Sequence, residues 1–200
     1  GVPVTSSAAA FSWNQATSVR ALSPSCRQLS RAASSSPAMR PIFFSSPTMA
    51  QIRKAKSLGV IANIQPPFLY RSGESDLERS AATGGDAPVF PVKTMIDEGV
   101  TVSASSDSPC AMVEPLTGLY ALVTRRTRLN RVTVEADEAL TPLEALKLYT
   151  KNAAYAMSRE TEVGTLEKGK RADMVVLSHD ITSVDPEFIR EMTVDQTYVD

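Results

Sequence analysis

Asp107 is the residue best placed to carry chemistry in this 200-residue sequence. Val100 and Val102 alternate with small polar residues, which is the period of a β-strand, and the following Ser-Ser-Asp-Ser-Pro stops a strand and forms a loop. Asp107 is therefore predicted just beyond the carboxyl end of a strand, where a carboxylate can serve as a base or bind a metal ion. The same composition is typical of a turn in which aspartate accepts a local backbone hydrogen bond, and both interpretations stay open.

The residues before this strand predict the elements that position it. Ser46 as N-cap and Pro47 at the first helical position predict a helix that ends at Gly59. Residues 60–64 are nearly all apolar, which is typical of a buried parallel strand. Residues 65–70 are predicted as a loop, 71–87 as a mobile connection and 89–98 as a short helix. A strand, a helix and a second strand in this order predict parallel pairing.

The residues after Asp107 predict two more helices and a β-rich end. Residues 114–126 form an amphipathic pattern, with Arg125, Arg126 and Arg128 expected to extend outward near its end. Thr141, followed by proline and then by Glu144, predicts a capping box. The helix that it opens is expected to bury Leu143, Leu146, Ala153 and Met157, while residues 174–177 and 193–199 predict strands.

Composition excludes several classes of protein. A formal net charge of −1 gives no electrostatic case for binding nucleic acid or an anionic membrane. No apolar run approaches the roughly 20 residues needed to cross a bilayer. Cys26 and Cys110 lie far apart without metal-ligand spacing, which favours a reducing, cytoplasmic compartment. Cys110 has no neighbouring histidine or cysteine to activate it, so a role as ligand or nucleophile is not favoured.

Residues 1–46 differ from the rest of the chain. They hold twelve serines and four arginines, and no acidic residue occurs before Glu74. Such a segment has little to bury and is predicted to be disordered. A Ser- and Arg-rich segment poor in acids is also typical of an organellar transit peptide, which is the alternative interpretation.

Four blocks of the chain carry a family resemblance. They are MAQIRKAKSLGVIANIQPPFLY, GVTVSASSDSPCAMVEPLTGLYALVTRRT, LTPLEALKLYTKNAAYAM and GTLEKGKRADMVVLSHD. In this order they resemble the amidohydrolase superfamily, in the branch called amidohydrolase-3 or YtcJ-like. The resemblance implies an α/β fold, with residues 47–158 as the C-terminal part of a (β/α)₈ TIM-type barrel and 159–200 as part of a small accessory β-domain. A whole barrel takes about 250 residues.

The resemblance also implies an activity and a site. It implies a metal-dependent hydrolase of carbon–nitrogen bonds other than peptide bonds, with a small amide-type substrate and a divalent metal ion, zinc by resemblance. Asp107 matches the carboxylate that binds the metal ion and takes a proton from its water. Phe68 or Tyr70 would either line the substrate pocket or simply pack over the barrel mouth. Asn152 matches a structural position, and Asp173 is expected to bond locally.

The ligand set of such a site is incomplete in this sequence. Catalytic zinc usually needs about three protein ligands, and His179, the single histidine, lies in the tail as an expected surface residue. We therefore predict that the chain alone is inactive, or that it is a non-catalytic half-barrel remnant or interaction module. Exposed strand edges at residues 60–64 and 100–103 would favour self-association. A shifted reading frame between roughly residues 6 and 44 would explain why the family's spacing survives there without its histidines.

Overall fold

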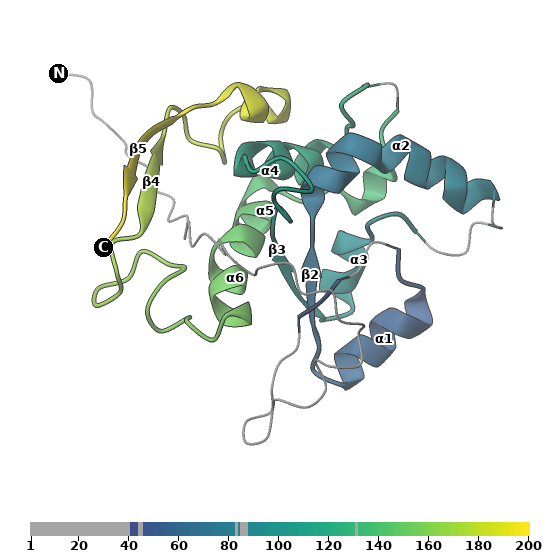
Figure 1. The fold of residues 1–200 in the computed structure, drawn as a ribbon, viewed down its shortest axis with the longest axis horizontal. Helices are drawn as coiled ribbons and strands as arrows, with labels where there is room; N and C mark the ends of the chain where they lie inside the picture. The colour runs from purple at the N-terminus through teal and green to yellow at the C-terminus, as the bar shows by residue number, and fades with distance from the viewer. Residues whose placement is uncertain (1–40, 44–45, 83, 85–87, 131) are drawn as a thin grey trace.

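A computed structural model describes residues 41–43, 46–82, 84, 88–130 and 132–200 (Figure 1). The predictions of disorder, of a transit peptide and of a shifted reading frame fall almost wholly outside the described residues. Within these residues, no helix is long and apolar enough to cross a membrane.

Three parallel strands form the main sheet. They are β1 (Pro41–Phe43), β2 (Ile61–Ile64) and β3 (Thr101–Ala104), in the order β1-β2-β3. Ala62 lies opposite Val102 and Ile64 opposite Ala104, so the predicted parallel pairing is confirmed. The prediction that residues 60–64 form an unpaired edge is wrong, because β2 pairs with β1 on its other side. In the described sheet, β3 is an edge strand.

Helix α1 (Met49–Ser57) begins two residues later than predicted. Thr48, not Ser46, is the N-cap: its hydroxyl accepts a hydrogen bond from the Gln51 backbone N–H, and the Gln51 side chain accepts one from the Thr48 N–H at 2.8 Å. This reciprocal pair satisfies two backbone donors that a serine cap at position 46 would leave open. The helix ends before Gly59, whose φ of 62° is a left-handed conformation that glycine adopts without steric cost.

Helix α2 (Pro66–Ala82) replaces the predicted loop at residues 65–70 and most of the predicted mobile connection. Its two leading prolines occupy the first turn, where a missing N–H removes no helical hydrogen bond. Leu69, Tyr70 and Gly73 are buried along one face. A side chain on Gly73 would lie only 3.0–3.3 Å from Leu69, Val134 and Thr127, so this glycine permits close packing.

The remaining helices cover the sheet and lead to the β-rich end. They are α3 (Val92–Asp97), α4 (Pro115–Thr124), the 3₁₀ helix η1 (Ala136–Glu138), α5 (Pro142–Tyr149), α6 (Lys151–Ala156) and the 3₁₀ helix η2 (Pro186–Glu191). Strands β4 (Met174–Leu177) and β5 (Val194–Tyr198) pair antiparallel. Figure 1 shows them apart from the main sheet, beyond the helices α4, α5 and α6.

The predicted capping box at Thr141 is confirmed, but the helix after it is not continuous. Thr150, at φ −116° and ψ −91°, separates α5 from α6 and changes which residues face inward. Ala145, Leu148 and Ala154 are buried, whereas the predicted core residues Leu143 and Met157 are 50% and 44% exposed. The break shifts the helical phase only for residues after it, such as Met157; Leu143 lies before it, in the first turn of α5.

Arg125 corrects the expectation of three outward arginines. Its residue exposure is 0%, and its guanidinium donates to the backbone carbonyls of Val134 (2.8 Å), Phe90 (3.1 Å) and Val89 (2.7 Å). Its left-handed backbone, at φ 57°, ends α4. Burial lowers the pKa of Arg125 to about 10. This arginine therefore joins the loop before α3 to the loop after α4.

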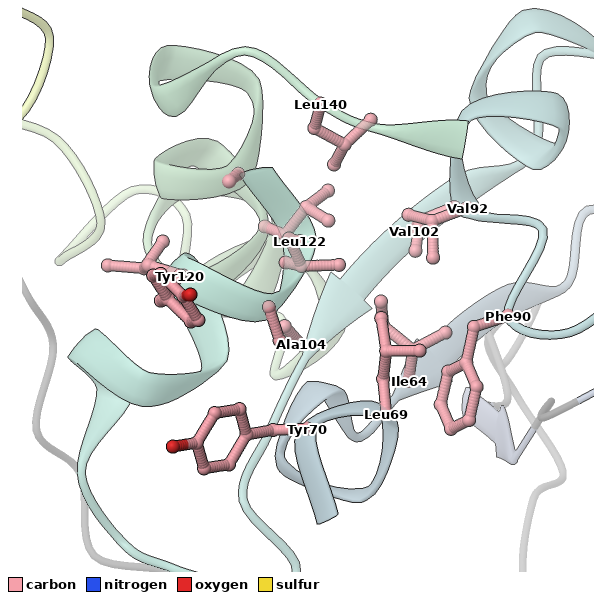
Figure 2. Packing of buried hydrophobic residues seen from close by; sticks show 14 of the residues in the cluster. Ile64, Leu69, Tyr70, Phe90, Val92, Val102, Ala104, Tyr120, Leu122 and Leu140 are labelled. Atoms are coloured by element: carbon pink, nitrogen blue, oxygen red, sulfur yellow. The ribbon is translucent and has the colours of Figure 1, made fainter. Parts of the chain in front are cut away.

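The core lies between the sheet and the helices. Figure 2 shows Ile64, Val102 and Ala104 of the strands close to Leu122 of α4 and Leu69 of α2. These strand residues alternate with polar ones, because successive side chains of a strand point to opposite faces. One face of the sheet is therefore apolar and covered by helices, and the other carries the polar residues.

Candidate functional site

Four polar side chains line the carboxyl end of β2 and β3, and we call them the polar face: Asn63, Gln65, Ser103 and Ser105. Asn63 and Ser103 are Cα partners across the parallel pair. The Ser103 hydroxyl donates to Asn63 Oδ1 (3.1 Å), and Asn63 Nδ2 donates to Ser105 Oγ (3.0 Å). These bonds show that the polar residues of two strands form one connected network.

Gln65 is the most unusual member of the polar face. It is 4% exposed, and its Nε2 donates to Ser105 Oγ (3.3 Å) and to the Asn63 backbone carbonyl (3.4 Å). Its side-chain oxygen Oε1 is buried and has no hydrogen-bond partner among the described residues. Buried polar atoms nearly always have a partner, so this unpaired oxygen is an exception that needs an explanation.

Asp107 lies three residues beyond the end of β3, as the sequence predicts. It is exposed and has a left-handed φ of 57°, which aspartate tolerates better than most residues. Its backbone carbonyl accepts a hydrogen bond from the Cys110 N–H (2.8 Å), which closes a turn. In the described part of the chain, its carboxylate has no hydrogen bond or ion pair. The turn is real, yet it leaves the side chain free.

Helix α2 holds the loop that carries Asp107. Arg71 donates from its guanidinium to the Cys110 carbonyl at 2.7 Å, and the same group lies 4.7 Å from the centre of the Phe68 ring. Sequence reasoning missed Arg71, because a loop was expected where the helix lies. It also missed the polar face, although the alternation of apolar and polar residues in Ala-Asn-Ile-Gln and Val-Ser-Ala-Ser is a readable signal.

Tyr70 belongs to a junction between α2, α4 and η2. Its ring meets Tyr120 edge to face, with centroids 6.1 Å apart, and its hydroxyl accepts from Arg190 at 3.3 Å. The Tyr120 hydroxyl donates to Glu187 (2.9 Å), and burial raises the pKa of this phenol. These are packing contacts, and packing was the alternative to a role for Tyr70 in the substrate pocket. A pocket role for Phe68, which is half-buried, and for Tyr70 stays a prediction.

The described residues do not by themselves fit a divalent metal ion. Among them, no group of three or more His, Cys, Asp or Glu side chains could hold one. His179 is exposed, as expected, with its ring 5.0 Å from that of Phe188 in an edge-on contact. Asp173 accepts a hydrogen bond from the Asp200 N–H (3.1 Å), which lies 27 residues further along the chain, so this bond is not the local one expected. Asp107 thus offers one carboxylate without companions.

Asn152 has the structural role that the sequence suggested. Its Nδ2 donates to the Val102 carbonyl at 2.8 Å, which attaches α6 to the strand that leads to Asp107. The bond uses a carbonyl of β3, an edge strand in the described sheet. Asn152 therefore helps to hold the position of the strand.

Comparisons with known proteins show what this chain is similar to. The chain is 43% identical over 112 residues to an N-substituted formamide deformylase of Arthrobacter pascens, covering 56% of this chain and 20% of that protein. It is 29% identical over 152 residues to the putative amidohydrolase YtcJ of Bacillus subtilis strain 168, covering 74% of this chain and 28% of that protein. The chain thus spans less than a third of the length of these two relatives.

Solved structures show the same relationship. A metal-dependent hydrolase of Pyrococcus horikoshii OT3 superposes with a TM-score of 0.59 at 25% identity, over 74% of this chain and 30% of that one. A second, from Pyrococcus furiosus, gives 0.56 at 26% identity, over 73% and 29%. The amidohydrolase family model matches residues 26–200, which confirms the resemblance drawn from the four blocks. This chain belongs to the amidohydrolase family.

Proposed function

We propose that this chain contributes the carboxylate side of the active site of a metal-dependent hydrolase that cleaves carbon–nitrogen bonds, other than peptide bonds, in small amides. The observation that carries the proposal is the exposed Asp107 at the carboxyl edge of a parallel sheet, beside the polar face; its carboxylate has no partner among the residues that the structure describes. Active sites of parallel α/β folds lie at that edge. The deformylase relative supports N-substituted formamides as the substrate class.

The proposed architecture is that of part of a larger enzyme. We assign residues 47–158 to the C-terminal part of a (β/α)₈ barrel and residues 159–200 to part of an accessory β-domain. Adjacent parallel strands joined by helices support the first assignment, and the separate β4–β5 pair supports the second. The free, exposed Cys110 supports a reducing compartment such as the cytoplasm.

The chemistry assigned to this chain rests on Asp107 alone. Its carboxylate would accept a proton from the water that attacks the amide carbonyl and return that proton to the leaving nitrogen. Arg71, through the Cys110 carbonyl, would hold the loop in place. A divalent metal ion, zinc by resemblance, would need ligands that the described residues do not offer, so we assign no step to it.

A segment exchange tests the proposal. Residues 41–200 of this chain replace the matching segment of the Arthrobacter pascens deformylase, and hydrolysis of N-alkylformamides is measured with Zn²⁺ or Mn²⁺ added. Metal-dependent turnover that Asp107→Asn abolishes, while Asp173→Asn keeps it, is the expected result. A folded chimera without turnover would favour the alternative, a non-catalytic module.

A further inference from the structure

We infer that the side-chain oxygen of Gln65 accepts a hydrogen bond from the N–H group of a secondary amide bound at the carboxyl edge of β2 and β3. This makes Gln65 a binding and positioning residue, beside the carboxylate of Asp107. The inference deepens the proposed function and rests on it for the class of ligand. The evidence for the acceptor itself comes from the hydrogen bonds of the polar face.

The orientation of the Gln65 amide is fixed by its partners. A primary amide has two donor hydrogens on nitrogen and one acceptor oxygen. Nε2 contacts the Asn63 backbone carbonyl, which has no hydrogen to donate, so the nitrogen must be on that side. Ser105 Oγ accepts from the same Nε2 and from Asn63 Nδ2. Both contacts lie on the nitrogen side, and Oε1 is turned away from them.

The free oxygen lies where ligands of parallel sheets bind. Gln65 directly follows Ile64, whose Cα partner is Ala104, the last residue of β3. Asp107 lies three residues after Ala104, and its side chain also has no partner within the described residues. Ligands of parallel α/β folds bind outside the carboxyl ends of the strands. An acceptor and a carboxylate, both free, therefore follow neighbouring strand ends.

The one other buried side-chain atom without a partner among the described residues, Tyr149 Oη, has a different setting. It lies on α5, against Gly118 of α4 and near Pro66, within the packing of the helices. Gln65 is instead part of a polar network on the other face of the sheet.

The chemistry of the acceptor selects the ligand. A neutral carbonyl oxygen needs a donor, and the N–H of a secondary formamide supplies one, whereas a tertiary formamide has none. A site built around a hydrogen bond discriminates strongly against the analogue that lacks the group. Gln65 is therefore expected to distinguish N-monosubstituted from N,N-disubstituted formamides.

A binding experiment on the full 200-residue chain tests this inference without any turnover. The ¹⁵N-labelled protein is titrated with N-butylformamide and with N-butyl-N-methylformamide, and the backbone amide signals of Asn63, Ser105 and Asp107, which the wild type and Gln65→Met share, are followed by NMR. We expect the first compound to bind about tenfold more tightly than the second. In Gln65→Met, which removes the acceptor, this preference should fall below about twofold.

Controls separate the hydrogen bond from other causes. Gln196→Met, at an exposed glutamine of β5, should leave the preference unchanged. If Gln65→Met fails to fold, Ser105→Ala takes its place: it removes one partner of Gln65 Nε2 and should reduce the preference. A preference that persists in Gln65→Met would be steric and would overturn the inference, as would absence of binding to the folded wild type. An inactive chimera with an intact N–H preference would refute the proposed function alone.

Discussion

The contact between Tyr149 and Gly118 gives a stability prediction whose sign the structure decides. A Cβ on Gly118 would lie 1.9 Å from Tyr149 Oη and 2.9 Å from Cζ, far inside normal contact distances. In an open helix, Gly→Ala stabilises by about 1 kcal/mol. Here the tyrosine hydroxyl is buried and the helices α4 and α5 pack against each other. Overpacking of a core costs about 1–3 kcal/mol, so we expect Gly118→Ala to destabilise by about 2 kcal/mol.

The partner substitution should act in the opposite direction. Tyr149 Oη has no hydrogen-bond partner in the described residues, and a buried unpaired polar group costs about 1–3 kcal/mol. Tyr149→Phe therefore removes a cost and no bond, and we expect it to be neutral or stabilising by about 1 kcal/mol. In the double variant the closest atom of the clash is gone, so we expect a favourable coupling of about 1–2 kcal/mol.

Urea unfolding of the wild type, both single variants and the double variant measures these terms, with Tyr155→Phe as the control. Burial also raises the pKa of Tyr149 above its ordinary 10.0. The unfolded chain therefore loses this proton first, and stability should fall as the pH rises past about 10, less steeply in Tyr149→Phe. Additive effects, or a Gly118→Ala variant more stable than the wild type, would refute the reasoning.

Three further predictions concern the site, a buried cation and the sheet edge. The isolated chain should show no hydrolysis of N-formyl or N-acyl compounds with added Zn²⁺ or Mn²⁺, and metal-dependent turnover that Asp107→Ala removes would contradict this. Arg125→Met should lower the free energy of unfolding by about 3 kcal/mol or more in urea, because three backbone carbonyls lose a charged donor. Arg128→Met, at an exposed position, should change it little. Equal effects of the two substitutions would count against the buried role of Arg125. Light scattering should show self-association, because β3 offers an edge in the described sheet, and a monodisperse monomer would show that this edge is protected.

The location of Asp107 could be predicted from sequence because its determinants are local. Alternating valines indicate the strand, and the Ser-Asp-Ser-Pro run ends it. The Thr141 capping box was predictable for the same reason, since its partners lie three residues apart. The polar residues at every second position of β2 and β3 are likewise visible in the sequence. Their hydrogen bonds are not, because these depend on the register between two strands about 40 residues apart.

The errors arose where distant contacts overruled local signals. Pro66, Pro67 and Gly73 are typical of a loop, yet the two prolines begin helix α2 and the glycine lies within it. Gly73 is accommodated there because it packs closely against Thr127 and Val134, which come from a later part of the chain. Arg125 reads as a solvated helix end, yet three carbonyls from two distant loops bind it in the interior. The sequence by itself determined the strands β2 and β3, the Thr141 cap and the family. The tertiary structure alone decided which polar atoms are satisfied and that Gln65 Oε1 is not, because a hydrogen bond depends on where both partners lie in space.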